Sequence, residues 1–283
     1  MPPGACDCHT HVIGPRGDYP MVADRHYTPG EAPHEALLAH LGRHGLERVV
    51  IVQPSVYGTD NRCMLDSLDR LDGMGRGVAV LDDAVDAAGL KALHRRGVRA
   101  LRVNVESAGL RDTAIVQAAL DRWAGRIEML GWHLQLYAAP DTIAGLAEHL
   151  AQMPVAVVLD HFAMVPASLP LDDPRAAALL GLLRSGNAYV KLSAPYRLGA
   201  AGSTADTDVG ALAGAFLAVA PERVLWGSDW PHTDREPGKA AHEVSRYRTL
   251  PQGMLERGIA TWMPTQQVRR QVLADNPARL YRF

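Results

Sequence analysis

The stretch Val155-Ala156-Val157-Val158-Leu159-Asp160-His161 is a short apolar run, rich in β-branched residues, that becomes polar at its last positions. Such a run is typical of a buried strand, because strands of four to eight residues favour Val and Ile. Similar runs recur along the chain and predict eight strands. They begin near Ala5, Val49, Arg76, Val98, His133, Val155, Ala188 and Arg223.

Amphipathic segments lie between these runs and predict helices. In the clearest, 112–130, apolar residues recur at alternating spacings of four and three and form one helix face. A last helix is expected over 265–275, ending before Pro277, because the residue ahead of a proline is pushed out of the α region. The other expected helices span 35–44, 61–74, 86–96, 141–152, 173–185 and 206–219.

Eight strands alternating with helices in 283 residues predict a single α/β domain over 1–283, a distorted (β/α)8 TIM barrel. The uneven spacing of the strand starts keeps a doubly wound open sheet as the alternative. However, no glycine-rich phosphate fingerprint follows the first strand. Two long segments punctuated by Pro and Gly, 14–31 and 235–263, are expected to be loops over one mouth of the barrel, with an ordinary surface loop as the alternative for each.

The composition excludes several classes of protein. Lys and Arg number 29 and Asp and Glu 31, so the net charge of −2 argues against a nucleic-acid or membrane-surface binder. The longest apolar stretch, 209–220, is too short to span a bilayer, and no signal-peptide pattern opens the sequence. Three cysteines, Cys6, Cys8 and Cys63, do not predict a disulfide framework. We therefore expect a cytoplasmic protein without nucleic-acid or membrane partners; an oligomer remains possible.

The first expected strand ends in Cys6-Asp7-Cys8-His9-Thr10-His11. Because side chains alternate along a strand, we expect Asp7, His9 and His11 on one face. Cys6 and Cys8 would then pack on the outer face. Two imidazoles at the C-terminal end of a barrel strand would ligate one metal ion or contact one substrate. The plainer interpretation is a pair of hydrogen-bonded loop histidines.

Two other strand ends carry ionisable groups. His161 ends the sixth expected strand, and Asp229 follows the eighth in Trp226-Gly227-Ser228-Asp229-Trp230-Pro231-His232. A barrel places all strand ends on one rim, so we expect both residues to converge with the His9–His11 pair. Three imidazoles and one carboxylate fit a zinc- or manganese-type site, or a carboxylate base among donors. The alternative is a helix-capping Asp229 and a hydrogen-bonded core histidine.

Further strand ends supply candidate substrate groups. Arg102 and Asn104 end the fourth expected strand, and Tyr137 ends the fifth. An arginine aimed into a barrel mouth is unfavourable unless it binds an anion or pairs with an acid, and no acid lies beside Arg102 on its strand face. We therefore expect Arg102 to bind an anionic substrate group, with Arg197 contacting the same group from the loop after the seventh strand. Lys191 is expected to be a structural partner.

These residues resemble the amidohydrolase superfamily over nearly the whole chain. The resemblance rests on His9-x-His11, His161, Asp229 within its Trp-Gly-Ser-Asp-Trp-Pro-His motif, and the closing Asn276-Pro277-Ala278-Arg279-Leu280-Tyr281. Three further motifs, with Arg197, are similar to the branch of 2-pyrone-4,6-dicarboxylate lactonase and related lactone hydrolases. They are Val52-Gln53-Pro54-Ser55, Gly58-Thr59-Asp60-Asn61 and Leu101-Arg102-Val103-Asn104.

The resemblance implies roles for individual residues. Asp229 resembles the base that activates water, and His9, His11 and His161 resemble the groups that polarise a lactone carbonyl. Substrate contacts are implied for Arg102, Arg197, Tyr137, Ser55 and Tyr27. Members of this branch differ in whether they bind a metal ion. The resemblance therefore implies either one divalent ion, zinc or manganese, on His9, His11, His161 and Asp229, or no metal.

The sequence departs from the dicarboxylate lactonase after the fourth expected strand. The run Val105-Glu106-Ser107-Ala108-Gly109-Leu110 lacks the further basic residues found there, so a second substrate carboxylate is absent or is bound differently. We expect a hydrolase of aromatic catabolism that opens a small carboxylated lactone, of pyrone or muconolactone type, by attack of water. The alternatives are a metal-dependent decarboxylase or sugar-lactone isomerase of the same fold, and a barrel that binds a carboxylate without turnover.

Overall fold

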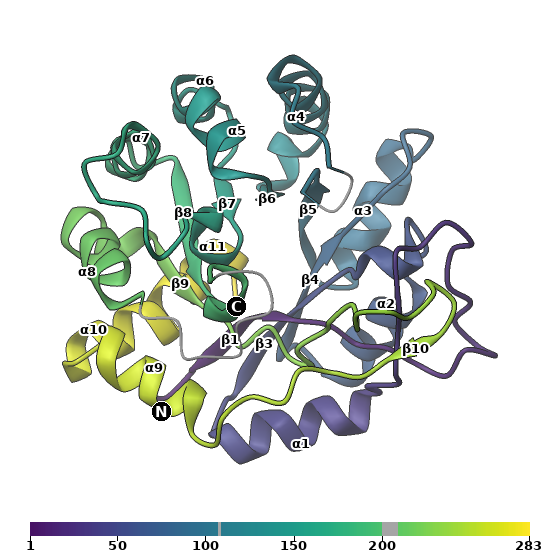
Figure 1. Cartoon of the computed structure of the whole chain (residues 1–283). Coiled ribbons are helices and arrows are strands. Elements are labelled where there is room, and N and C mark those ends of the chain that lie inside the picture. The colour runs from purple at the N-terminus through teal and green to yellow at the C-terminus, as the bar shows by residue number, and fades with distance from the viewer. Residues whose placement is uncertain (107–108, 200–208) are drawn as a thin grey trace.

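A computed structural model describes residues 1–106, 109–199 and 209–283. Eight parallel strands form one sheet in chain order, and helices surround it, so the strands are the wall of a TIM barrel (Figure 1). The strands are β1 (Cys6–Thr10), β3 (Arg48–Val52), β4 (Gly75–Ala79), β5 (Val98–Asn104), β6 (His133–Tyr137), β7 (Val157–Leu159), β8 (Ala188–Leu192) and β9 (Val224–Trp226). Each expected strand start lies within two residues of an observed one, and the predicted barrel is confirmed.

The barrel closes between β1 and the segment that follows β9, which excludes the open sheet. The Asp229 N–H donates to the His9 carbonyl at 2.9 Å, and the His11 N–H donates to the Trp230 carbonyl at 2.8 Å. The two backbones approach so closely that a Cβ at Gly227 would lie 2.6 Å from the His9 Cβ. This closing seam therefore places His9 and Asp229 side by side.

The helices on the outside of the barrel follow the expected segments. Asp86, Asp112 and Asp173 each accept backbone N–H groups from the first turn of the helix that they precede. The expected helix 141–152 is divided at Leu146, and residues 206–208 of another lie outside the described residues. The helices are α1 (His34–His44), α2 (Arg62–Arg70), α3 (Ala87–Arg95), α4 (Thr113–Ile127), α5 (Pro140–Gly145), α6 (Ala147–Ala151), α7 (Pro174–Arg184) and α8 (Gly210–Val219).

The C-terminal third of the chain corrects two expectations. The segment 235–263 is not wholly a loop, because α9 (Met254–Trp262) buries Met254 and Ile259 against the barrel. The last helix also does not end before Pro277: α10 (Gln266–Arg270) continues through the π-helix η6 (Gln271–Asp275) into α11 (Asn276–Tyr281). The wider π-helical turn of η6 directly precedes Pro277, so the chain remains helical past a residue that has no N–H to donate.

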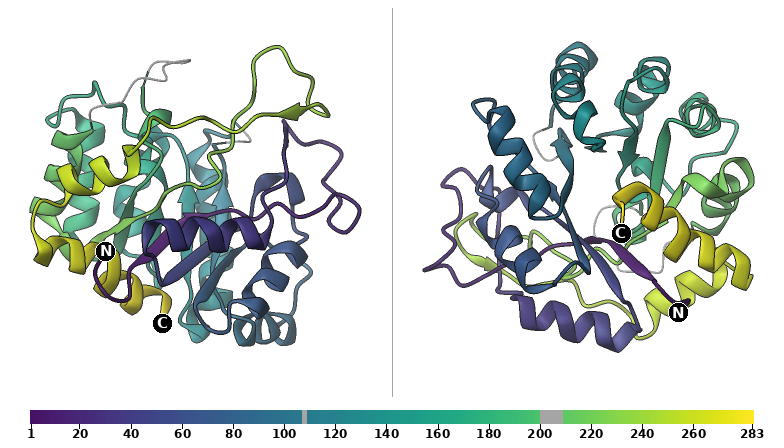
Figure 2. Two further views of the ribbon diagram at one scale, coloured as in Figure 1. Left: turned by 90° about the horizontal axis from the view of Figure 1, so that it is seen from below. Right: turned by 180° about the vertical axis from the view of Figure 1, so that it is seen from behind.

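The two long loop segments are joined to each other. The short strand β2 (Thr28–Pro29) pairs in parallel with β10 (Val244–Ser245), and Val244 lies opposite Thr28 in the register. Figure 2 shows the parts of these segments around β2 and β10 extending from the barrel on the side away from the chain termini, whereas α9 lies beside residues 1–3. No helix within the described ranges is long and apolar enough to cross a bilayer.

The expected alternation along β1 is wrong. The register between β1 and β3 shifts between Asp7 and Thr10, and this irregularity changes which side chains face inward. Cys6 and Cys8 pack inside the barrel, against Val50, Val52 and other inward-facing residues, and not on the outer face. The Asp7 carboxylate instead contacts α1 outside the wall, with Oδ2 3.1 Å from the Nε2 of His40.

Candidate active site

A cavity of about 300 Å³ lies at the C-terminal ends of the strands. Its wall contains all but one of the candidate site residues: His11, Tyr27, Ser55, Arg102, Tyr137, His161, Arg197 and Asp229. The exception is His9, which is fully buried and lies with its ring centre 5.1 Å from that of His11 and 4.6 Å from that of His161. Other wall residues are Pro54, Asn104, Thr233, Asp234, Arg235 and Arg248.

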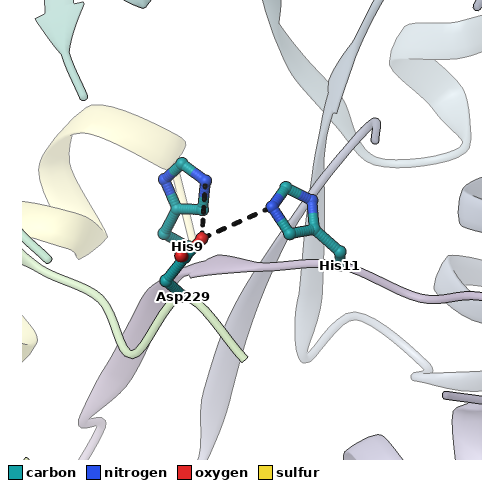
Figure 3. Close-up of side chains that lie close together, drawn as sticks. All are labelled: His9, His11 and Asp229. Atoms are coloured by element: carbon teal, nitrogen blue, oxygen red, sulfur yellow. Dashed lines mark ion pairs between the residues drawn. The ribbon is translucent and has the colours of Figure 1, made fainter. Parts of the chain in front are cut away.

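The two oxygens of the buried Asp229 carboxylate have different surroundings. Oδ2 accepts hydrogen bonds from the Tyr196 hydroxyl at 2.7 Å and from the Arg197 Nη2 and Nε at 2.8 and 3.1 Å. Oδ1 has no hydrogen-bond partner in the described part of the chain. It faces the Nε2 atoms of His9 at 3.7 Å and His11 at 3.5 Å (Figure 3). One oxygen therefore fixes the carboxylate, and the other is available for chemistry.

Electrostatics keep Asp229 ionised. Burial alone would raise the pKa of this carboxyl, but the charge of Arg197, which pairs with Oδ2, outweighs burial and holds the pKa well below its usual range. Burial also lowers the pKa of His161 to about 3, so His161 is a neutral imidazole at neutral pH. The site therefore combines a carboxylate with an uncharged ring.

A hydrogen bond assigns the proton on His11. The His11 Nδ1 lies 2.8 Å from the carbonyl oxygen of Val52, which can only accept, so Nδ1 carries the hydrogen. The His9 Nδ1 lies between an acceptor and a donor, 3.2 Å from Oδ1 of Asp160 and 3.4 Å from the Nζ of Lys191. Burial, with a smaller contribution from Lys191, lowers the pKa of His9 well below its usual range, so this ring is neutral. In a neutral His11 ring, the Nε2 lone pair then faces Oδ1 of Asp229.

Three potential ligand atoms surround one small gap: the Nε2 atoms of His9 and His11 and Oδ1 of Asp229. This gap fits a shared proton or a divalent cation. Two ligands on a tetrahedral ion with bonds of about 2.1 Å lie roughly 3.4 Å apart, close to the observed spacings. The contacts to Val52 and Asp160 are of the kind that orient metal-binding histidines. His161 belongs to a second group of potential ligands, with His9 and Asp160.

His161 lies directly after β7, on the short turn η3 (His161–Met164). It has a left-handed backbone, with φ of 51°, which turns the chain sharply and brings the ring to the cavity wall. Its Nδ1 lies 2.9 Å from the hydroxyl oxygen of Ser193, and its ring meets that of Tyr137 edge-on, at 5.2 Å. If Ser193 donates to Nδ1, the hydrogen of the neutral ring is on Nε2.

Arg102 and Arg197 are each paired with a buried carboxylate. Nη2 of Arg102 lies 3.2 Å from Oδ2 of Asp160, and Nη2 of Arg197 lies 2.8 Å from Oδ2 of Asp229. The expectation that no acid accompanies Arg102 holds only for its own strand, because Asp160 comes from the end of β7. Each guanidinium has five N–H donors, so pairing leaves further donors at the cavity wall.

Sequence reasoning missed three buried polar residues at the site, Asp160, Gln135 and Tyr196. Oδ2 of Asp160 accepts a hydrogen bond from the Gln135 Nε2 at 3.1 Å. Lys191 donates to Oε1 of Gln135 at 2.6 Å and lies 3.5 Å from Oδ1 of Asp160, so it is a buried partner, as expected. Asp160 could have been found from the sequence, because it lies two residues after Val158 at the strand end and therefore faces the barrel interior with it. Tyr196 gave no signal beyond its place beside Arg197.

A TIM barrel whose C-terminal rim carries a His-x-His pair, a third histidine and an ionised aspartate defines an enzyme site of the acid–base or metal-assisted type. The chain belongs to the amidohydrolase family, because the family model described as Amidohydrolase matches residues 6–283. The resemblance drawn from the sequence is thereby confirmed.

Curated relatives refine this placement. A 4-sulfomuconolactone hydrolase of Hydrogenophaga intermedia is 34% identical over 99% of this chain and 89% of its own length. A 2-pyrone-4,6-dicarboxylate hydrolase of Comamonas testosteroni is also 34% identical, over 99% of this chain and 91% of its own. A D-galactarolactone isomerase of Agrobacterium fabrum is 26% identical over 100% of this chain and 92% of its own length.

A solved structure of a Pseudomonas putida protein, named for 2-pyrone-4,6-dicarboxylic acid hydrolysis, is 32% identical to this chain. The two structures match with a TM-score of 0.81, over 99% of this chain and 98% of that one. The similarity therefore extends over the whole barrel.

Proposed function

We propose that this chain hydrolyses a small anionic lactone of pyrone or muconolactone type, with Asp229 as the general base. The observation that carries the proposal is the asymmetry of the Asp229 carboxylate. Tyr196 and Arg197 hold Oδ2, while Oδ1 lies without a hydrogen-bond partner among the described groups, beside two imidazoles. Support for the substrate class comes from the relatives named for 4-sulfomuconolactone and 2-pyrone-4,6-dicarboxylate hydrolysis.

The reaction adds water across the ring ester. Oδ1 of Asp229 takes a proton as the water oxygen attacks the lactone carbonyl carbon. The ring C–O bond then breaks, and the ring oxygen takes that proton back from Asp229 to become a hydroxyl. The new carboxylic acid releases its own proton to solvent and becomes a carboxylate. A carboxylate whose pKa is held low is a weak base, so attack requires a strongly polarised carbonyl. We assign this polarisation to His9, His11 and His161, and substrate positioning to Arg102, Arg197, Tyr137, Ser55 and Tyr27.

If a divalent ion binds, His9, His11 and Asp229 would hold it, with His161 as the further candidate ligand. Imidazole and carboxylate donors suit zinc or manganese better than magnesium or calcium, which prefer oxygen ligands. Such an ion would supply Lewis-acid polarisation of the carbonyl and lower the pKa of water. The Asp229 side chain would still be held by Tyr196 and Arg197.

The charge of the buried site supports an anionic substrate. Arg102, Lys191 and Arg197 carry three positive charges, whereas Asp160 and Asp229 carry two negative ones. His9 and His161 are neutral, since burial lowers the pKa of each. This group therefore has an excess of one positive charge, which a substrate carboxylate or sulfonate would compensate.

A panel of lactones with a pH indicator tests the proposal. Hydrolysis releases one proton per ring opened, whereas an isomerase of the D-galactarolactone type releases none in rearranging a lactone, and a decarboxylase releases carbon dioxide. The isomerase is the second candidate, because one relative carries that name. Binding of a carboxylate with no turnover of any lactone would instead support a non-catalytic barrel and overturn the proposal.

A further inference from the structure

The cavity wall contains two further arginines, Arg235 and Arg248, and Arg248 lies three residues beyond β10. Its guanidinium carbon lies 5.3 Å from the centre of the Tyr196 ring, and that of Arg197 lies 5.7 Å from the same ring. The Arg248 backbone N–H donates to the carbonyl of His232 at 2.9 Å, which fixes this loop to the segment that follows Asp229. Arg248 is therefore held beside the proposed catalytic groups.

The arginines of the cavity differ in how readily their carboxylate partners can leave. Asp160 and Asp229, the partners of Arg102 and Arg197, have fully buried side chains. Neither can turn away without leaving a buried charge unpaired, which is strongly unfavourable. Asp234, which pairs with Nη2 of Arg248, is 28% exposed. It can turn into solvent, where an ion pair contributes little.

Arg248 also has an unused hydrogen-bond donor. Its Nε is buried and has no hydrogen-bond partner within the described ranges. Nε and one Nη of a guanidinium form the planar fork that binds both oxygens of a carboxylate or sulfonate. An exchangeable partner and an unpaired buried donor together make Arg248 better suited than Arg102 or Arg197 to accept an incoming anion.

We propose that Arg248 binds an anionic group on the substrate ring remote from the reacting carbonyl, and thereby selects lactones that carry two anionic groups. This inference rests on the proposed function. It assigns to Arg248 the contact that the run 105–110, which has no Lys or Arg, does not supply. Asp234 occupies the guanidinium when the cavity is empty, and the substrate anion replaces it.

The test compares Arg248→Met and Arg248→Lys on 2-pyrone-4,6-dicarboxylate and its two monocarboxylate analogues. The matched control is Arg246→Met, because Arg246 pairs with Glu236 and has an 84% exposed side chain. Arg248→Met should raise KM for the dianion about 10–100-fold, with kcat within about threefold, and should change KM for one monoanion by less than about threefold. Lysine should restore part of this loss. Equal losses on all three lactones, or none, would overturn the inference.

Asp234→Asn should change KM for the dianion in the opposite direction to Arg248→Met. Removing the competing carboxylate should lower KM for the dianion about two- to tenfold, whereas a purely structural Arg248–Asp234 pair predicts that both substitutions raise KM alike. If wild-type protein opens none of the lactones, the proposed function fails, and calorimetric titration of the same dianion still tests Arg248. Binding that is tight in wild type and weak in Arg248→Met would retain the anion site; equal binding would reject it.

Discussion

His40 donates its Nε2 hydrogen to Oδ2 of Asp7 at 3.1 Å, while Oδ1 of Asp7 accepts the backbone N–H groups of His9 at 3.1 Å and Ser228 at 2.9 Å. One buried carboxylate thus joins both sides of the seam that closes the barrel. We expect Asp7→Ala to lower the free energy of unfolding by about 2–4 kcal/mol, since buried donors lose a charged acceptor. Urea denaturation measures this. Asp66→Ala, at an exposed ion pair, should change it by less than about 0.5 kcal/mol.

Asp229→Asn should remove the proposed base and leave the barrel folded. The amide keeps the shape of the side chain but does not accept the proton, so kcat should fall about 10²–10⁴-fold. Single-turnover kinetics together with circular dichroism measure activity and folding. Asp60→Asn, at an exposed pair with Arg62, is the control and should retain full activity. A nearly unchanged kcat in Asp229→Asn would refute the role.

Arg102→Met should raise KM for a charged lactone more than it lowers kcat, because a positioning contact acts in ground and transition states alike. Arg197→Met should raise the same KM and also lower kcat, because Arg197 holds Oδ2 of the proposed base Asp229. The neutral methyl ester should be affected less. Arg102→Lys should recover only part of the loss, since lysine lacks the planar fork. Arg102→Met also leaves Asp160 without a charged partner on that side, so the thermal midpoint of this variant should fall. The thermal midpoint of Arg62→Met, which breaks an exposed pair, should not. Equal kinetic losses on lactone and ester would remove the anion-binding role.

The stability of the protein should depend on buried His133. Burial lowers the pKa of its ring to about 3, and both ring nitrogens lack a hydrogen-bond partner in the structure as described. Between about pH 3 and 6.5 the unfolded chain binds a proton that the folded chain does not, so stability falls as pH falls through this window. His133→Leu should reduce this slope by up to about 1.4 kcal/mol per pH unit. Chemical denaturation at several pH values checks it; an unchanged slope would show that His133 is not responsible.

The gap between His9, His11 and Asp229 is the place where a divalent ion would bind. We expect elemental analysis to find zinc or manganese at no more than one per chain, and exhaustive chelation to lower activity, which the same metal restores. His11→Ala should weaken metal binding, whereas His26→Ala, at an exposed loop position, should not. Full activity in metal-free protein would instead assign the gap to a shared proton.

The strands could be predicted from the sequence because each is a dense apolar run, and the residues at their ends follow from barrel geometry. The Arg102–Asp160 pair could not, because it joins side chains from β5 and β7 across the barrel interior. The reversed orientation of Cys8 follows from an irregular register, which no alternation rule anticipates. α9 was missed because the segment around it is rich in Pro and Gly and its first turn has no capping side chain.

The pairing of β2 with β10 joins two distant segments of the chain into one structural unit at the rim of the cavity. Tyr27 directly precedes β2, and Arg248 follows β10 by three residues, so both wall residues are carried on one two-stranded ribbon. A change in the length of either segment displaces the other through the shared register. Substrate preference could therefore be transplanted between barrels of this kind only by exchanging residues 14–31 and 235–253 as a unit.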